Sequence, residues 1–310
     1  MSWRLKIVHT TRFAYDSVAH ASYNEARLTP PTLLTQTTLE SRVEIEPPAP
    51  IYRYHDYWAT HVSAFDLDDE HSELVVTATS TVETTQHAPR PEPSITWLAL
   101  QHPTTTDRFA EYLAQTTRTA VDDELVAEVR EHVQGMSPNE TALRISSWIH
   151  DAVEYMPGST GVQTSAREAW HRRQGVCQDI AHLSAGLLRR FGIPARYVSG
   201  YVHPKRDALI GETVKGQSHA WVEWWDGDWV GHDVTNDQPI GVQHVVVARG
   251  RDYGDVPPVR GVYKGHAGQN LSVDVLVRPA VDDEGAELLQ ETSAAPPPKP
   301  EEEQRQQQQQ

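Results

Sequence analysis

The pattern of apolar and polar positions in the first part of the chain is that of short β-strands. Trp3, Leu5 and Ile7 alternate with polar neighbours, and residues 51–67 are rich in aromatic and β-branched side chains. Alternation with a period of two predicts strands with one buried face, and the Pro-Pro and Asp-Asp steps between the runs predict turns. We therefore expect an antiparallel β-sandwich domain over residues 1–85.

The spacing becomes helical after a proline-rich segment, residues 86–105, which we interpret as a linker. Helical patterns cover residues 106–115, 122–134 and 138–154, and a capping-box pattern at residues 165–168 opens a shorter helix. Strand patterns follow at residues 195–202, 217–225, 228–235, 242–248 and 270–278. Helices followed by strands indicate an α+β domain, which we place at residues 106–281.

Composition adds three limits to this picture. The tail, residues 282–310, is acidic and rich in proline and glutamine, so it cannot bury a core and is predicted to be disordered. The net charge of −16 argues against a nucleic-acid partner, because phosphate binding needs a basic face. The chain has no run of about 18 apolar residues, so the sequence predicts no membrane span. The N-terminus has no apolar signal segment, and one cysteine suits a reducing compartment, so we expect a cytoplasmic protein.

The single cysteine, Cys177, directly precedes a helical run. Apolar residues recur three and four positions apart as far as Phe191, and Gly192 and Pro194 mark the end of the helix. Because Gly175 breaks the preceding segment, Cys177 lies at or next to the helix N-terminus, where free N–H groups and the macrodipole favour a thiolate. A lone cysteine is more often a small buried hydrophobe, so this residue alone does not decide between packing and catalysis.

A β-hairpin is predicted where an Asp-Gly turn separates two runs rich in tryptophan and valine. A three-residue loop that ends at Gly227 would pair Trp224 with Asp228. His219 would then lie opposite Asp233, with both side chains on one face of the hairpin. A two-residue loop would send the two side chains to opposite faces. The apolar pattern favours the first register, because it gathers Val222, Trp224, Val230 and Val234 on the other face.

Three motifs occur in the order Gly-Val-Cys177-Gln-Asp, Ser-His219-Ala-Trp-Val-Glu and Trp-Val-Gly-His-Asp233-Val-Thr-Asn. Over about residues 145–240 the chain resembles the transglutaminase-like superfamily. The resemblance is to the bacterial branch with an N-terminal β domain, and residues 250–261 support that branch. In one departure, valine follows Asp233 where the family usually has proline, which removes a rigid turn residue but no titrating group.

The resemblance implies a papain-like α+β core in which Cys177 is the nucleophile, His219 the base and Asp233 the carboxylate that orients the base. This is also the arrangement that a thiol at a helix N-terminus and a neighbouring His–Asp pair would allow. The sequence alone does not show that Cys177 reaches His219.

The oxyanion site is less well defined by the sequence. The backbone N–H of the nucleophile is the natural first donor. Tyr155 or Trp170 could supply a side-chain donor, although packing is the better explanation of both residues. Gln178 could line the cleft or contribute to the helix start.

These residues predict acyl transfer at a peptide or protein amide through a thioester. Water as the acceptor would make the protein an amidase or peptidase, which we favour, and an amine would make it a transglutaminase. Metal hydrolysis with Cys177, His219 and Asp233 as ligands is a second class, but no further His or Cys stands at a short ligand spacing. We therefore predict no metal and no cofactor. A third hypothesis is an adaptor with a relic triad.

Overall fold

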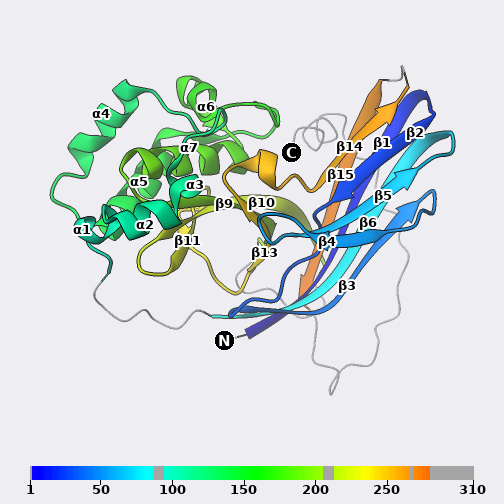
Figure 1. Ribbon diagram of the computed structural model, residues 1–310, viewed down its shortest axis with the longest axis horizontal. Helices are drawn as coiled ribbons and strands as arrows, with labels where there is room; N and C mark the ends of the chain where they lie inside the picture. The colour runs from blue at the N-terminus through cyan, green and yellow to red at the C-terminus, as the bar shows by residue number, and fades with distance from the viewer. Residues whose placement is uncertain (1, 87–93, 205–212, 266–267, 280–310) are drawn as a thin grey trace.

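The computed structural model describes residues 2–86, 94–204, 213–265 and 268–279. The predicted tail and residues 87–93 of the predicted linker lie outside these residues. A helix-rich lobe and a β-sandwich lie side by side, and the chain starts at the bottom of the sandwich in the view of Figure 1. The α+β class predicted from the sequence is confirmed.

The sandwich contains two antiparallel sheets built mainly from the first part of the chain. One sheet contains β1 (Ser2–Ala19), β6 (His71–Thr85) and β3 (Gln36–Glu46), and the other contains β2 (Ala21–Ala26), β5 (His61–Leu67) and β4 (Tyr52–His55). Strand β2 was not expected from the sequence. Apolar side chains such as Leu28, Phe65 and Leu74 fill the space between the sheets, as alternating inward positions require.

Seven helices are described in the second part of the chain: α1 (Trp97–Leu100), α2 (Pro103–Arg108), α3 (Ala110–Leu113), α4 (Asp123–His132), α5 (Pro138–Ala152), α6 (Ala166–Arg172) and α7 (Cys177–Arg190). Capping boxes at Ser137 and Ser165 begin α5 and α6, as the sequence pattern predicted for α6. Two differences from the expectation concern the start of this region. The predicted helix 106–115 is divided at Phe109, and α1 and α2 begin inside the predicted linker.

The helical lobe covers a group of antiparallel strands that carries the candidate site. Its sheet has the order β12 (Gln238–Pro239), β11 (Trp229–Asp233), β10 (Val214–Trp225), β9 (Ala195–Val202), β13 (His244–Gly250). A short parallel pair, β7 (Glu154–Tyr155) and β8 (Gln174–Gly175), precedes α7. Helix α7 packs between the other helices and this sheet, and 13 of its 14 residues are buried. The core of the lobe therefore fixes the position of the N-terminus of α7.

The last two strands return to the sandwich, which differs from the predicted domain boundary. We placed residues 270–278 in the helical domain, but β15 (Gln269–Pro279) pairs with β1, from Leu5 with Pro279 to Tyr15 with Gln269. Strand β14 (Val259–Lys264) pairs with β2 in the second sheet. The buried Val275 and Val277 of β15 pack with Leu5 and Ile7 of β1 and with Tyr197 and Tyr201 of β9, in a core cluster separate from that between the two sandwich sheets.

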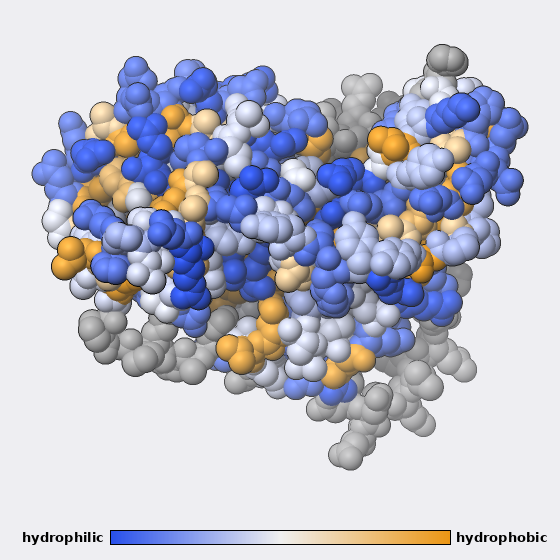
Figure 2. All heavy atoms as spheres, in the orientation of Figure 1, coloured by the Kyte–Doolittle hydropathy of each residue, from blue (hydrophilic) through white to orange (hydrophobic). Residues whose placement is uncertain are grey.

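The two lobes share a sheet. Residues 214–216 of β10 pair with residues 275–277 of β15, so one nine-stranded sheet runs from the sandwich into the helical lobe. Hydrophilic residues cover most of the face shown in Figure 2, and apolar residues occur there in small groups. Among the described residues, no helix is long and apolar enough to cross a membrane.

Candidate active site

Cys177 is the first residue of α7, and its side chain is buried. The carboxylate of Asp179 fixes this helix start: its Oδ2 accepts a hydrogen bond from the backbone N–H of Val176 at 2.9 Å and one from the hydroxyl of Thr160 at 2.5 Å. A Cβ on Gly175 would lie 2.9 Å from the Cβ of Asp179, so only glycine fits there. The Gly-Val-Cys-Gln-Asp motif therefore encodes the local geometry that positions the thiol.

Asp179 is completely buried, and burial raises its pKa to about 6 although hydrogen bonds from Thr160 and Val176 act in the opposite direction. Its Oδ1 has no hydrogen-bond partner among the described residues. The carboxyl group is therefore close to half-protonated at slightly acidic pH, two residues after Cys177 on the same helix.

His219 lies on β10 with its ring between Cys177 and Asp233. Its Nε2 is 2.9 Å from Oδ2 of Asp233, which leaves Nδ1 for the interaction with the thiol. Burial lowers the pKa of His219, but hydrogen bonds to Asp233 and Cys177 outweigh it and raise the pKa to about 10. The ring is therefore an imidazolium at neutral pH and can partner a thiolate.

Asp233 ends β11 and is completely buried. Burial raises its pKa, but hydrogen bonds from His219 and His244 outweigh burial and hold the pKa well below its usual range. The side-chain amide of Asn236 also donates to Oδ2, at 2.7 Å, and its backbone N–H donates to Oδ1. Asp233 therefore stays ionised and fixed in orientation.

His244 is a residue of this cluster that the sequence analysis missed. Its Nδ1 accepts from the N–H of Gly241 at 3.2 Å, so its Nε2–H donates to Oδ2 of Asp233, also at 3.2 Å. Burial lowers the pKa of His244, which keeps the ring neutral. The sequence predicts a strand over residues 242–248, which contains His244. No pattern in the sequence indicates that this strand, β13, lies close to Asp233 in the fold.

The hairpin register differs from the expected one by two residues. Trp224 pairs with Val230, so the three-residue loop runs from Asp226 to Asp228 and not from Trp225 to Gly227. The rings of Trp225 and Trp229 pack edge to face with centroids 5.7 Å apart, and this cross-strand pair favours the observed register. Because the shift is an even number, the faces stay as predicted. His219 and Asp233 meet as diagonal neighbours.

The three other candidate residues lie in different environments. Gln178 lines a small cavity of about 20 Å³ together with Cys177 and His219, and its amide donates to Val162 O at 3.4 Å. Tyr155 pairs with Gly175 through β7 and β8 and is 39% exposed, and burial and the neighbouring Cys177 raise its pKa to about 12. Trp170 instead packs in the core against Trp148, with ring centroids 4.9 Å apart.

The arrangement can bring a thiol, a protonated imidazole and a buried carboxylate into one hydrogen-bonded line. Such a line provides a nucleophile, a general acid or base, and a group that fixes the tautomer of the base. Within the described residues, no group of three or more His, Cys, Asp or Glu side chains is arranged to hold a metal ion.

Comparisons with known proteins show the family of the chain. Residues 124–234 match the model of the transglutaminase-like superfamily, and residues 5–83 match the bacterial transglutaminase-like N-terminal region. An uncharacterized protein of Mycobacterium leprae is 46% identical over 273 residues, which cover 88% of this chain and 98% of that protein. The chain belongs to the transglutaminase-like superfamily.

Two further similarities concern the fold and part of the sequence. The crystal structure of a protein of Cytophaga hutchinsonii named "Putative Cysteine Protease" has a TM-score of 0.70 at 23% identity, and the match covers 92% of this chain and 96% of that chain. This likeness shows the fold alone. A protein-glutamine gamma-glutamyltransferase of Pseudomonas aeruginosa is 34% identical over 85 residues, which are 26% of this chain and 12% of that protein.

Proposed function

We propose that this transglutaminase-like protein transfers an acyl group from an amide through a thioester on Cys177. The observation that carries the proposal is the position of His219, which interacts with Cys177 on one side and with Asp233 on the other. Neither a packing cysteine nor a solvent-facing histidine requires this buried line of three groups.

In this mechanism the imidazolium of His219 holds the proton that the thiol has lost. The sulfur of Cys177 attacks the carbonyl carbon of the amide and forms a tetrahedral intermediate. His219 then gives its proton to the leaving nitrogen, the C–N bond breaks, and a thioester and a free amine result. In the second half His219 takes a proton from water, the hydroxide attacks the thioester, and the C–S bond breaks to release a carboxylic acid and to restore the Cys177 thiolate beside the His219 imidazolium.

The oxyanion of the tetrahedral intermediate needs two donors. The backbone N–H of Cys177 is at the first position of α7, where a helix leaves N–H groups without a partner inside the helix. We propose Tyr155 as the second donor in preference to Trp170, because the phenol is close enough to Cys177 to interact with it and is protonated at neutral pH. Trp170 is held in the core by its packing against Trp148.

We propose water as the usual acyl acceptor, so that the protein acts as an amidase or peptidase on a peptide or protein amide. An amine acceptor would make it a transglutaminase, and the similarity to part of the Pseudomonas enzyme favours this alternative. Both reactions share every step up to the acyl-enzyme. An adaptor role with a relic triad is the third possibility, and it predicts an unreactive thiol.

The net charge of −16 supports a substrate other than nucleic acid. A lone free cysteine suits a reducing compartment, and on this ground we propose the cytoplasm as the location.

The first test is the pH dependence of alkylation of Cys177 by iodoacetamide, which is unambiguous because the chain has one thiol. If the ion pair exists, wild-type protein is alkylated below pH 6, and His219→Ala slows the reaction at that pH at least 10-fold. The matched control is His171→Ala, an exposed histidine on α6 that pairs with Asp122. Equal rates in wild type and His219→Ala would reject the proposal and favour the adaptor.

A second test separates the two acceptors. Peptides that contain glutamine are incubated with the enzyme, with and without an added primary amine, and the masses of the products are measured by mass spectrometry. Conversion of the carboxamide to an acid, or cleavage of the chain, identifies water as the acceptor. An amine adduct that replaces these products at millimolar amine would identify a transglutaminase.

A further inference from the structure

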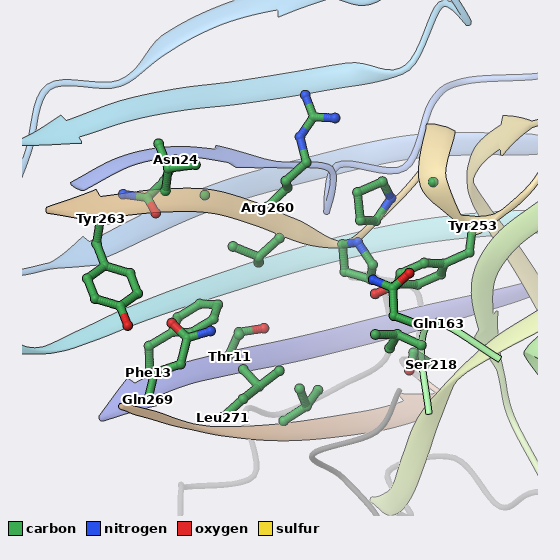
Figure 3. Close-up of a pocket in the computed structure, with 18 of the residues that line it drawn as sticks. Thr11, Phe13, Asn24, Gln163, Ser218, Tyr253, Arg260, Tyr263, Gln269 and Leu271 are labelled. Carbon is green, nitrogen blue, oxygen red and sulfur yellow. The ribbon is translucent and has the colours of Figure 1, made fainter. Parts of the chain in front are cut away.

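A cavity of about 500 Å³ lies between the two sheets of the sandwich, on the side that faces the helical lobe (Figure 3). Its floor is the inner face of β1 and β15. Three cross-strand pairs form this floor: Thr11 with Val273, Phe13 with Leu271, and Tyr15 with Gln269. The floor thus combines aromatic and aliphatic surface with hydroxyl and amide groups, which is the mixture typical of ligand sites.

The cavity continues into the candidate active site. Ser218, Tyr253 and Pro258 line both this cavity and the small cavity that contains Cys177 and His219. Ser218 directly precedes His219 on β10. A molecule bound between the sheets can therefore extend to the thiol of Cys177 while it stays in contact with the protein.

The upper side of the cavity is the edge strand β14, and five consecutive residues of it, 259–263, line the space. Within the described residues, β14 pairs only with β2. The bond from the N–H of Arg27 to the carbonyl of Pro258 sets the phase of this ladder. By alternation, Val259, Gly261 and Tyr263 direct their N–H and C=O groups to the unpaired edge.

Side chains of β14 follow the same alternation. Tyr263 points into the cavity towards Phe13 and Gln269, and Arg260 points away from it (Figure 3). The ring of Tyr263 lies 5.0 Å from that of Tyr15. Gly261 has no side chain of its own on the inner face, and a Cβ there would lie 2.2 Å from Oδ1 of Asn24, which also lines the cavity.

The charges around the cavity are already matched. Arg118 donates to Gln163 at 2.9 Å and lies 4.0 Å from Asp252, and Arg260 pairs with Glu25 at 3.1 Å. The cavity therefore offers hydrogen-bonding and apolar surface without an unmatched charge, which suits an uncharged ligand.

We propose that the cavity binds an extended, uncharged peptide segment of the substrate, which adds a strand to the free edge of β14 and leads its amide to Cys177. The inference rests on the proposed function, and it assigns substrate recognition to the sandwich. Main-chain hydrogen bonds to an exposed edge give affinity, and alternate side-chain pockets give selectivity. Six extended residues span about 20 Å, which is the length of a strand such as β14.

The test uses the full chain with Cys177→Ala, so that binding is measured without turnover. A library of uncharged hexapeptides, each with a central glutamine, is mixed with the protein, and retained peptides are identified by mass spectrometry after size exclusion. We expect selected hexapeptides to bind at least 10-fold more tightly than dipeptides from their centres. N-methylation of alternate backbone amides should remove most of this gain, because it removes strand donors.

Two tryptophan variants on one strand provide the matched control. Leu271→Trp fills the cavity floor on the inner face of β15 and should weaken hexapeptide binding at least 10-fold. Leu276→Trp makes the same change on the outer face of β15, where the side chain is 45% exposed, and should bind as the parent does.

Two outcomes would overturn the inference: no hexapeptide is retained, or Leu271→Trp and Leu276→Trp bind the retained peptides alike. Acylation of wild-type Cys177 by p-nitrophenyl acetate, followed by mass spectrometry, tests the proposed function separately. If the thiol is acylated and no peptide binds, the recognition site is wrong and the chemistry stands. If peptides bind and the thiol stays inert, the chemistry is wrong and the peptide site stands.

Discussion

At the scale of single residues, Asp179 combines complete burial with a carboxyl oxygen that has no partner among the described residues. Its pKa of about 6 lies above the ordinary value of 3.8, and burial is the main cause. The folded state therefore holds the proton more tightly than the unfolded state. The stability that this provides is complete below pH 3.8 and is lost as the pH rises through about 6.

Asp179→Asn should remove this loss of stability at higher pH and keep the hydrogen bonds at the start of α7. The amide oxygen can accept the bonds from Val176 and Thr160, and the amide does not titrate. We expect the free energy of unfolding of Asp179→Asn, relative to wild type, to rise by about 1 kcal/mol from pH 5 to pH 7.5. Urea unfolding at both pH values measures this.

Asp179→Ala is the control, since it loses both hydrogen bonds and should be less stable than wild type at either pH. A relative stability of Asp179→Asn that falls from pH 5 to pH 7.5 would contradict the account. It would mean that the carboxylate charge itself stabilises the helix start.

The sequence could predict Cys177, His219 and Asp233 because each stands in a motif whose local geometry is short-range. His244 could not be found in this way, since its bond to Asp233 depends on how β13 packs beside β9 and β10. Thr160 is a similar case: its hydroxyl reaches Asp179 from 19 positions earlier in the chain, through a loop with no regular spacing.

At the scale of elements, α7 is the helix on which the site depends, and at Gly186 it packs closely on the loop between α3 and α4. A Cβ at this position would lie 2.0 Å from the carbonyl oxygen of Thr119. A helical glycine is ordinarily about 1 kcal/mol worse than alanine. Here we expect Gly186→Ala to destabilise the protein by about 2–3 kcal/mol, because backbone atoms must separate. Urea unfolding measures the loss.

Gly192→Ala is the comparison at the end of the same helix. Gly192 has φ of 78°, and nothing lies within 4 Å of its added Cβ. The cost should be the left-handed strain alone, about 1–2 kcal/mol. If Gly186→Ala is as stable as wild type or more stable, the helix does not pack as closely on Thr119 as described.

Helix ends were predicted more accurately than strand partners, and the reason is the range of the signals. The limits of α7 follow from Gly175, Gly192 and Pro194, which act within one turn. The hairpin register depends on whether Trp225 finds Trp229, and the return of β15 to β1 depends on 11 pairings across almost the whole chain. No local pattern distinguishes a strand that completes a distant sheet from one that extends the nearest sheet.

At the scale of the whole molecule, two buried histidines connect segments that lie far apart in the chain. His9 on β1 is hydrogen-bonded to the hydroxyl of Tyr201 on β9 at 2.9 Å, and His182 on α7 accepts from the N–H of Tyr253 at 3.0 Å. Burial lowers the pKa of His9 to about 4 and that of His182 to about 3. Both rings therefore stay neutral in the folded protein at pH values where the unfolded chain takes up protons.

This difference predicts that stability falls on acidification from pH 6.5. Between 6.5 and about 4 the unfolded state binds more protons at both histidines, so the free energy of unfolding decreases as the pH falls. At pH 5 each of these two histidines should lower the free energy of unfolding by about 2 kcal/mol relative to pH 7, and Asp179 should raise it by about 1 kcal/mol. His219 acts in the other direction: its raised pKa stabilises the fold below 6.5, and this stability is lost as the pH rises towards 10. Maximum stability is expected near pH 6.5–7.

Urea unfolding at pH 7 and pH 5 tests the assignment, with His9→Gln and His182→Gln as the variants. Glutamine keeps a hydrogen-bonding group in each place but does not titrate, so each variant should lose less stability on acidification than wild type, by about 2 kcal/mol. The exposed His171→Gln should behave as wild type. If His9→Gln and His182→Gln lose as much stability as wild type between the two pH values, these two histidines are not the groups that the acid titrates, and the neutral state of His9, which lines the peptide cavity, would have to be reconsidered.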